Sequence, residues 1–291
     1  MIIQYNSILG LTEIYDWTAI LYAVISILLL IGAKVLNQKW SGYNLDHQLT
    51  TEDNKAVAVS FAGFLLSLCL IINGVLTSPS ESSSLGGDLL ATVIWGSIAS
   101  ALLVLSRAIN DKLILPKFSN RKELIEDRNI GIGAVQAGGY IATALIIRAV
   151  FMSESTSSLG SEVMLTLGWF IVTQALFLLF TFAYQKFISF DLHKELENDN
   201  IAVGISFGGS LVAFGILLSL YLSQYDHLLG LIIWAIVAMF LLKGIRLATD
   251  KLLLPKQSLD DELVKDQNWG AAIIEAVVSI GGALILTGSL Y

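Results

Sequence analysis

The stretch VMLTLGWFIVTQALFLLFTFAY, residues 163–184, contains no charged side chain and has no continuous polar face. A helix needs about 20 mostly apolar residues to cross the hydrocarbon core of a bilayer. A surface helix of a soluble bundle has a polar face opposite its apolar one. The stretch therefore predicts a transmembrane helix. The composition agrees, because only 14% of the residues are charged, against about a quarter in soluble domains.

Similar runs recur along the chain, for example the uncharged runs at 17–33, 89–105 and 228–242. Together they predict an all-α integral membrane protein with eight transmembrane helices. The predicted spans cover residues 14–36, 55–77, 89–113, 129–151, 162–186, 201–223, 227–251 and 269–290.

The second half of the chain repeats the first. The segment DNKAVAVSFAGF (53–64) recurs as DNIAVGISFGGS (199–210), and the same alignment continues through later spans. The matches predict two tandem four-span repeats, residues 1–151 and 152–291. Because each repeat has an even number of spans, both enter the membrane in the same orientation. We therefore expect two parallel repeats related by a pseudo-twofold axis along the membrane normal.

Basic residues are distributed unevenly along the spans. Sixteen of the seventeen Lys and Arg residues lie in the links between spans 1–2, 3–4, 5–6 and 7–8 or at the adjoining helix ends, and Arg148 is the exception. The positive-inside rule then predicts that these four links are cytoplasmic and both termini lie outside. The net charge of −7 reflects outer loops that are poor in basic residues, and it gives no reason to expect a nucleic-acid partner.

The order of motifs within each half also resembles a known family. D-N-x-A-V-x-x-S-F-x-G opens one span, a Trp lies within the next, an Arg and LILP or LLLP close it, and N-x-G opens the last. This order resembles the YjfL-like uncharacterised bacterial inner-membrane proteins, which carry the domain of unknown function numbered 350. The resemblance covers most of both halves and implies two tandem copies.

Two positions depart from the pattern of that family. Its usual G-N-x-A reads D-N-x-A here, with Asp53 and Asp199 in place of the glycine, and Asn129 and Asn268 stand where an acidic residue is common. The resemblance implies a bacterial inner membrane. It implies no chemistry and no catalytic residues, because no activity is established for the family.

Glu275 is the sharpest candidate for a functional residue. It lies seven residues into NWGAAIIEAVVSIGGALIL, about 10 Å along a helix that rises 1.5 Å per residue. An ionisable group at that depth suggests an ion- or proton-binding site. The alternative is a hydrogen bond between helices. Helical spacing puts two equivalent polar stripes on the last span of each half: Asn268, Glu275 and Ser279, and Asn129, Gln136 and Tyr140.

Two charged pairs recur at equivalent positions. Arg107 and Asp111 in RAINDKLILPK match Arg246 and Asp250 in RLATDKLLLPK. The i,i+4 spacing puts both partners on one helix face, which predicts an ion pair at the cytoplasmic end of spans 3 and 7. A gate or a headgroup site remains the functional alternative.

Asp and Asn residues directly precede two spans. Asp53 and Asn54 precede the second span, and Asp199 and Asn200 precede the sixth. These residue types are favoured helix N-caps, because their side-chain oxygens accept hydrogen bonds from the free N–H groups of the first turn. We therefore expect helix caps at these four positions.

The sequence contains no metal-ligand motif, glycine-rich phosphate loop or nucleophile motif. We therefore expect neither an enzyme nor a metal or cofactor site. The favoured hypothesis is a structural or regulatory component of the inner membrane, with the lipid bilayer around it and either other envelope proteins or further copies of itself as partners. The alternative is a channel or transporter for ions, protons or small solutes, with a polar site around Glu275 between the repeats.

Overall fold

The computed structural model describes residues 17–78, 84–114, 119–152 and 159–290. Eight helices in these ranges are long and apolar enough to cross a membrane, which confirms the predicted all-α membrane fold. The start of the first predicted span, 14–16, lies outside the described residues. The spans are α1 (Trp17–Ser41), α3 (Lys55–Thr77), α4 (Leu85–Ile109), α6 (Ile130–Met152), α7 (Leu159–Phe187), α9 (Ile201–Leu222), α10 (Leu228–Ala248) and α12 (Trp269–Ser289).

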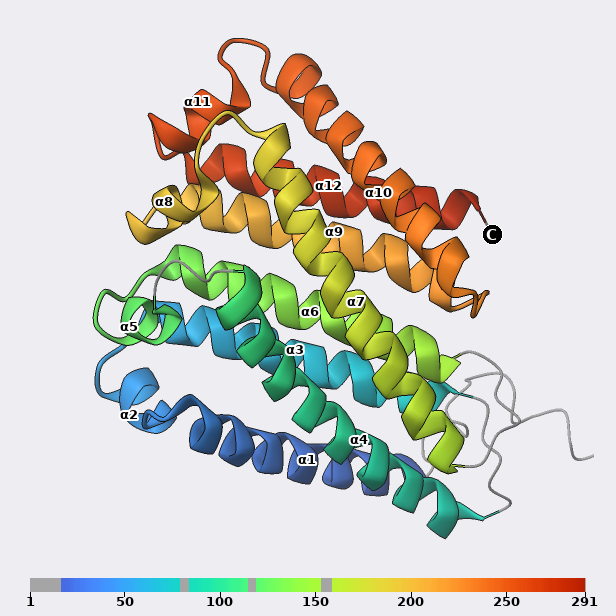
Figure 1. The fold of residues 1–291 in the computed structure, drawn as a ribbon. Helices are drawn as coiled ribbons and strands as arrows, with labels where there is room; N and C mark the ends of the chain where they lie inside the picture. Colours follow the sequence, from blue (N-terminus) through green and yellow to red (C-terminus); the bar gives the residue numbers. More distant parts are fainter. Residues whose placement is uncertain (1–16, 79–83, 115–118, 153–158, 291) are drawn as a thin grey trace, which may run out of the picture.

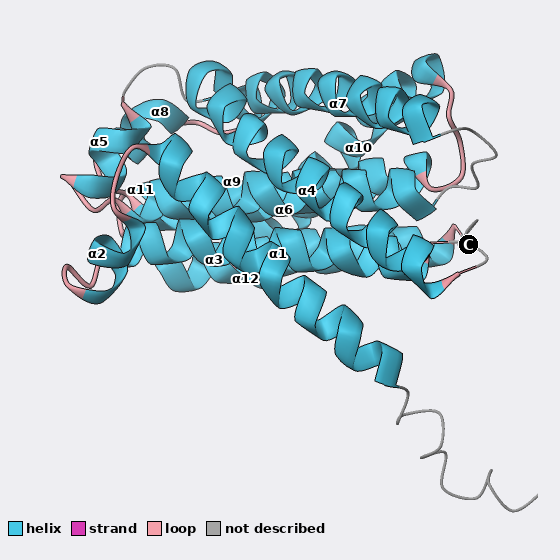
Figure 2. Cartoon of the chain, turned by 90° about the horizontal axis from the view of Figure 1, so that it is seen from below, coloured by secondary structure: helices cyan, strands magenta, loops and turns pink. Residues whose placement is uncertain are grey.

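Four short helices join the spans in pairs, and Figure 2 shows them gathered at one end of the molecule. Each one begins with a polar N-cap side chain, which satisfies N–H groups of its first turn. A π-helical turn ends α4 and α10: η1 (Asn110–Ile114) and η2 (Thr249–Leu253). The short helices are α2 (Leu45–Thr50), α5 (Asn120–Ile125), α8 (Leu192–Glu197) and α11 (Leu259–Val264).

Seven of the eight spans form two layers. Helices α3, α6, α9 and α12 lie side by side in this order, and α4, α7 and α10 cross one face of that row (Figure 1). All four helices of the row begin at the end that carries the short helices, so they run in parallel. The α6–α9 contact, which joins the two halves, is as extensive as the α3–α6 contact within the first half. The halves therefore form one continuous row.

The row is packed backbone against backbone at its centre. A Cβ atom added to Gly138 of α6 would lie 2.4 Å from the carbonyl oxygen of Gly208 of α9. Small residues allow helices in lipid to approach closely, where dispersion contacts and not the hydrophobic effect drive their association. The seam between the halves therefore depends on glycine at this position.

Within each predicted four-span repeat, the structure shows a smaller unit of two spans. Each helix of the row begins at a capping Asn whose backbone N–H donates to a backbone carbonyl of the preceding short helix. The residue before each Asn has positive φ, between 45° and 58°. The caps are Asn54, Asn129, Asn200 and Asn268, and the residues with positive φ are Asp53, Arg128, Asp199 and Gln267.

This geometry refines the expected helix caps. The side-chain oxygens of Asn54 and Asn200 accept hydrogen bonds from the N–H groups of Val57 and Val203, as a cap does. Asp53 and Asp199 instead form the left-handed turn that leads into each cap. Asp and Asn adopt this conformation at lower cost than most residues other than glycine.

The expected pseudo-twofold axis between the halves is not observed. A twofold axis that pairs α6 with α9 would also pair their repeat-equivalents α12 and α3. Instead, α3 and α12 lie at opposite ends of the row (Figure 1). The halves are related head to tail, because each two-span unit presents one face to the unit before it and a different face to the unit after it.

Candidate functional sites: two buried arginine clusters

The second half contains a buried charged cluster centred on Arg246, near the end of α10. Arg246 is 8% exposed. Its Nη1 donates to Glu275 Oε1 and, at 3.1 Å, to the hydroxyl of Tyr184. Its Nη2 donates to Asp260 Oδ1 at 2.6 Å. One guanidinium group therefore holds two carboxylates from different helices, as its fixed fork of donors allows.

Glu275 lies in α12 with no exposed surface. The hydroxyl of Ser206 in α9 donates to its Oε2, so both carboxylate oxygens have partners. The hydroxyl groups of Ser206 and Tyr184 lie 2.8 Å apart, and the Arg246 guanidinium lies 5.4 Å from the centre of the Tyr184 ring. A buried carboxylate is tolerated when a cation and hydrogen bonds compensate it in this way.

The first half contains a related cluster around Arg107 of α4, which is 5% exposed. Its Nη1 donates to Asn37 of α1 at 3.3 Å, and its Nε lies 3.6 Å from Asp111. The ring of Tyr43 lies 5.7 Å from the guanidinium. The predicted i,i+4 ion pair is therefore present in this half.

Amide side chains hold the acid of the first cluster. Asp111 Oδ1 accepts from Asn120 of α5 at 2.8 Å and from Gln136 of α6 at 3.1 Å. Gln136 Oε1 in turn accepts from the hydroxyl of Ser60 in α3 at 2.7 Å. Gln136 is the repeat-equivalent of Glu275, so the two clusters occupy the same place in each half but distribute their charges differently.

The second half does not form the i,i+4 pair that the sequence predicts. Arg246 pairs with Glu275 and Asp260, while Asp250 pairs with Lys251 at 2.9 Å and accepts from the N–H of Leu259. The physical reason is the acid on α12. In the first half, α6 carries the neutral Gln136, and Arg107 pairs with Asp111 four residues further along the chain. In the second half, α12 carries a carboxylate, Glu275, and Arg246 pairs with it.

The structure does not bring Glu275 and Gln136 together. Each belongs to the cluster of its own half, and α9 separates α6 from α12 (Figure 1). Asn129 and Asn268 cap their helices. Tyr140 lies beside Arg107 in the first half and packs edge-on to Phe64, and Ser279 lines a small cavity beside Arg246 and Tyr184 in the second half. The expected polar site between the repeats is thus replaced by one cluster within each half.

Three acidic side chains gather at the junction of the halves, outside the spans. Glu123 is 4% exposed and accepts a hydrogen bond from Asn129 at 3.1 Å. Burial raises the pKa of Glu123, although this hydrogen bond opposes the shift. Burial and the charge of Asp127 raise the pKa of Asp199. These two carboxyl groups therefore hold their protons more tightly than exposed ones.

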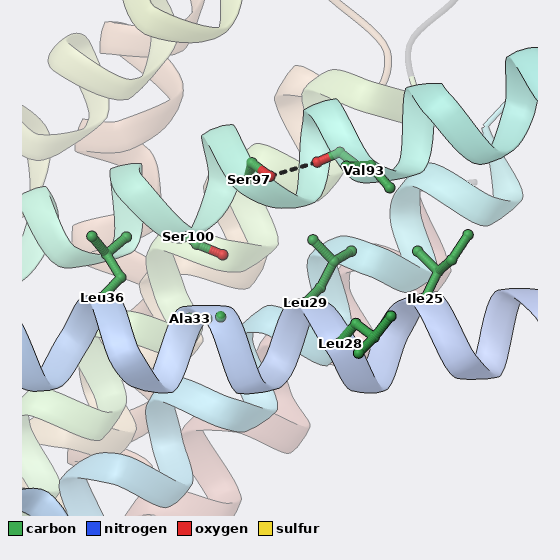
Figure 3. A pocket seen from close by; sticks show the side chains of 9 residues that line it. Ile25, Leu28, Leu29, Ala33, Leu36, Val93, Ser97 and Ser100 are labelled. Carbon is green, nitrogen blue, oxygen red and sulfur yellow. Dashed lines mark hydrogen bonds between the residues drawn. The ribbon is translucent and has the colours of Figure 1, made fainter.

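Two hollows are noteworthy in the described part of the chain. An open groove of about 440 Å³ lies between α1 and α4, and Figure 3 shows the aliphatic side chains that line it. A second cavity, of only about 10 Å³, lies beside Arg246 and Lys243. The groove offers an apolar surface of the kind that lipid chains contact, and the small cavity has room for about one water molecule. The groove is lined by Ile25, Leu28, Leu29, Gly32, Ala33, Leu36, Val93, Ser97 and Ser100.

Several members of the clusters could not be predicted from the sequence, or were predicted by no motif that stood out. Ser206 carried a usable signal, because Ser60 and Ser206 recur in the S-F-x-G motif of each half. Tyr184 and Asp260 carried none, since their contact with Arg246 depends on how α7 and α11 pack against α10. Among the described residues, no group of three or more His, Cys, Asp and Glu side chains is arranged to hold a metal ion.

Comparison with known proteins agrees with the duplication. The model of a family described as Domain of Unknown Function (DUF350) matches residues 8–151 and again 158–290. A UPF0719 transmembrane protein of Aquifex aeolicus (strain VF5) is 22% identical over 250 residues, which cover 83% of this chain and 88% of that protein. No solved structure matches.

Proposed function

This multi-pass membrane protein belongs to the DUF350 family in two tandem copies, and from that premise we propose that it is a non-catalytic structural or regulatory component of the membrane. In this proposal the row of spans is a rigid body that displays the four short helices at one membrane face. The short helices and their links are the surface through which it acts on other envelope proteins.

The observation that carries the proposal is that both carboxylate oxygens of the fully buried Glu275 are paired within the protein. Glu275 has no exposed surface, and its two oxygens are bound by Arg246 and Ser206. The cluster joins all four spans of the second half, α7, α9, α10 and α12, and the short helix α11. Such a network favours one arrangement of the helices, because any other arrangement leaves a buried charge unpaired. This suits a structural part better than a moving one.

A second candidate is proton or cation binding at the same cluster. It is favoured by the charge balance there, because Arg246 faces two carboxylates, Glu275 and Asp260. The group of three carries a formal charge of −1, whereas Arg107 and Asp111 sum to zero. A proton or a small cation would compensate the excess.

Flux through proteoliposomes separates the two candidates. We expect wild type, Glu275→Gln and Gln136→Glu to pass protons and potassium no faster than empty liposomes, measured with an internal pH dye and a potassium electrode. Gln136→Glu is the matched variant, since it places an acid at the equivalent position of the first half. Wild-type flux that falls to the background in Glu275→Gln would replace the structural proposal with the second candidate. Flux above that of empty liposomes that is equal in wild type and Glu275→Gln would dismiss both the structural role and a transport site at Glu275.

We further propose that the protein lies in a bacterial inner membrane, with the short helices in the cytoplasm and both termini outside. The unequal distribution of Lys and Arg supports this orientation. In a Cys69→Ala background, a membrane-impermeant thiol reagent added to whole cells should label Tyr225→Cys, whose parent residue is 55% exposed in the α9–α10 link. It should not label Lys256→Cys until the membrane is opened. The opposite pattern would invert the orientation.

A further inference from the structure

The three internal junctions of the row share one packing register. At each junction, small residues at fixed positions after the capping Asn of one helix meet small residues at fixed positions of the next helix. Near the cap, Gly133 lies against Ala56, and Gly204 lies against Gly131. In the middle of the helices the contacts are Gly63–Ala137, Gly138–Gly208 and Gly209–Ala276. Further along, Gly215 lies against Ala142. Counted from the capping Asn of each helix, residues 2, 9 and 13 of one helix of the row therefore face residues 4, 8 and 15 of the next helix.

Each end helix of the row exposes one of the two faces that pack together at the internal junctions. On α3, the fourth, eighth and fifteenth residues after Asn54 are Ala58, Ala62 and Cys69, and all three are exposed. On α12, the second and thirteenth residues after Asn268 are Gly270 and Gly281. A Cβ atom added to Gly281 would meet nothing within 4 Å. Both faces therefore have space for a further helix.

Each internal junction also contains a hydrogen bond between equivalent residues, from the side chain of a capping Asn to a carbonyl of the next short helix. The side-chain amide of Asn54 donates to the Leu124 carbonyl of the next short helix at 2.8 Å. Asn129 donates in the same way to Leu196, and Asn200 to Leu263 at 3.0 Å. Asn268, the fourth member, is exposed and donates to Glu262 of its own unit, but to no such carbonyl among the described residues.

The acceptor that would complete the series lies at the other end of the chain. In each short helix, one backbone carbonyl accepts the backbone N–H of the capping Asn that follows the helix. The next residue after this carbonyl is Leu124, Leu196 or Leu263 in α5, α8 and α11, and it is Leu49 in α2. One end of the row thus carries a cap amide that lacks a carbonyl from a following unit. The opposite end carries the short helix that provides this carbonyl at every other junction.

We propose that copies of this chain associate head to tail, with α12 of one copy packed in parallel against α3 of the next. Gly270, Val277 and Gly281 of one copy lie against Ala58, Ala62 and Cys69 of its neighbour, and Asn268 donates to the Leu49 carbonyl. The association continues the interface that already joins the two halves of one chain, and it does not depend on the structural role proposed above.

A second copy fits these faces for a reason of topology. The helices of the row all run in one direction, so a copy added at either end has the same orientation in the membrane as the first. Heterologous contacts of this kind close into a ring or extend as a filament. Val277 stands where Gly63, Gly138 and Gly209 stand at the internal junctions. Its larger side chain keeps the helices further apart, so the contact between copies is weaker than the contact between halves.

Cysteine cross-linking in native membranes tests the proposal. Cys69 is the one cysteine of the sequence and already lies on the α3 face, opposite the place of Gly281 in a neighbouring copy. With Gly281→Cys added, mild oxidation or a short bismaleimide should join the copies, seen as dimers and larger multiples in denaturing gels. Cys69→Ala with Gly281→Cys should give no such bands, because both cysteines of the contact are needed.

Three further variants make the result specific. Gly168→Cys, at another glycine with nothing within 4 Å of an added Cβ, should not cross-link to Cys69. Ala62→Leu should abolish the cross-link in the Gly281→Cys protein, since Ala62 is exposed and its enlargement blocks only the contact between copies. Val277→Ala should increase the cross-linked fraction several-fold. Cross-linking of wild type through Cys69 alone would show instead a symmetric α3–α3 contact and overturn the proposal, as would monomers throughout.

Discussion

Replacing Arg246 with methionine should lower the free energy of unfolding by about 3–5 kcal/mol, the cost that accompanies removal of one partner from a buried ion pair. Glu275 would remain fully buried but would lose its cation and keep only the hydroxyl group of Ser206. The measurement is the unfolding of purified protein in mixed micelles with increasing SDS, followed by circular dichroism.

Two matched variants identify the cause of that loss. Arg107→Met should cost less, because Asp111 is 28% exposed on its side chain and keeps hydrogen bonds from Asn120 and Gln136. Adding Glu275→Gln to Arg246→Met should restore a large part of the stability, since a glutamine occupies the equivalent position of the first half. Equal losses at the two arginines, together with no rescue, would show that the methionine acts through packing and that the buried charge is irrelevant.

Replacing Gly138 with leucine should destabilise the protein by about 3 kcal/mol or more, at or beyond the upper end of the usual cost of overpacking. A Cβ atom at this position would lie 2.4 Å from a backbone oxygen of Gly208. Backbone atoms in the centre of a helix cannot move aside as a flexible side chain can, so α6 and α9 must separate. The same SDS titration measures the change.

Gly168→Leu in α7 is the control for this substitution. A Cβ atom added to Gly168 would meet nothing within 4 Å, so the leucine can extend into lipid. We expect a change within about 0.5 kcal/mol, as for surface substitutions in general. A similar loss at Gly168 and Gly138 would mean that glycine is needed for helix flexibility and that the close seam between the halves is not the reason.

Local patterns explain which features could be predicted from the sequence. The eight spans follow from apolar runs of sufficient length, and the structure changes their limits by only a few residues: the third span begins at Leu85 instead of 89, and the fifth extends over Leu159–Phe187. Asn54 and Asn200 could be predicted as caps because a cap is made within one turn of helix. Glu275 was recognised because a charge in an apolar run needs no tertiary information to be noticed.

The partners of Glu275 could not be predicted in the same way. Arg246 is 29 residues away in the chain, and Ser206 is 69 residues away. The i,i+4 spacing suggested Asp250 as the partner of Arg246, which is correct for the equivalent pair in the first half. The carboxylate on α12 changes the outcome in the second half, and only the packing of α12 beside α9 and α10 shows that it lies within reach.

The sequence by itself determined that the chain is helical, crosses a membrane eight times and carries one unit twice, because hydrophobic length and repetition are properties of short segments. The tertiary structure decided how those segments are arranged. Glycines that let backbones touch place the helices in a parallel row, and this row replaces the twofold arrangement that the repeat suggested. The same packing brings Arg246 to Glu275 and leaves Asn268 at an open end, because contacts between distant segments depend on which faces meet.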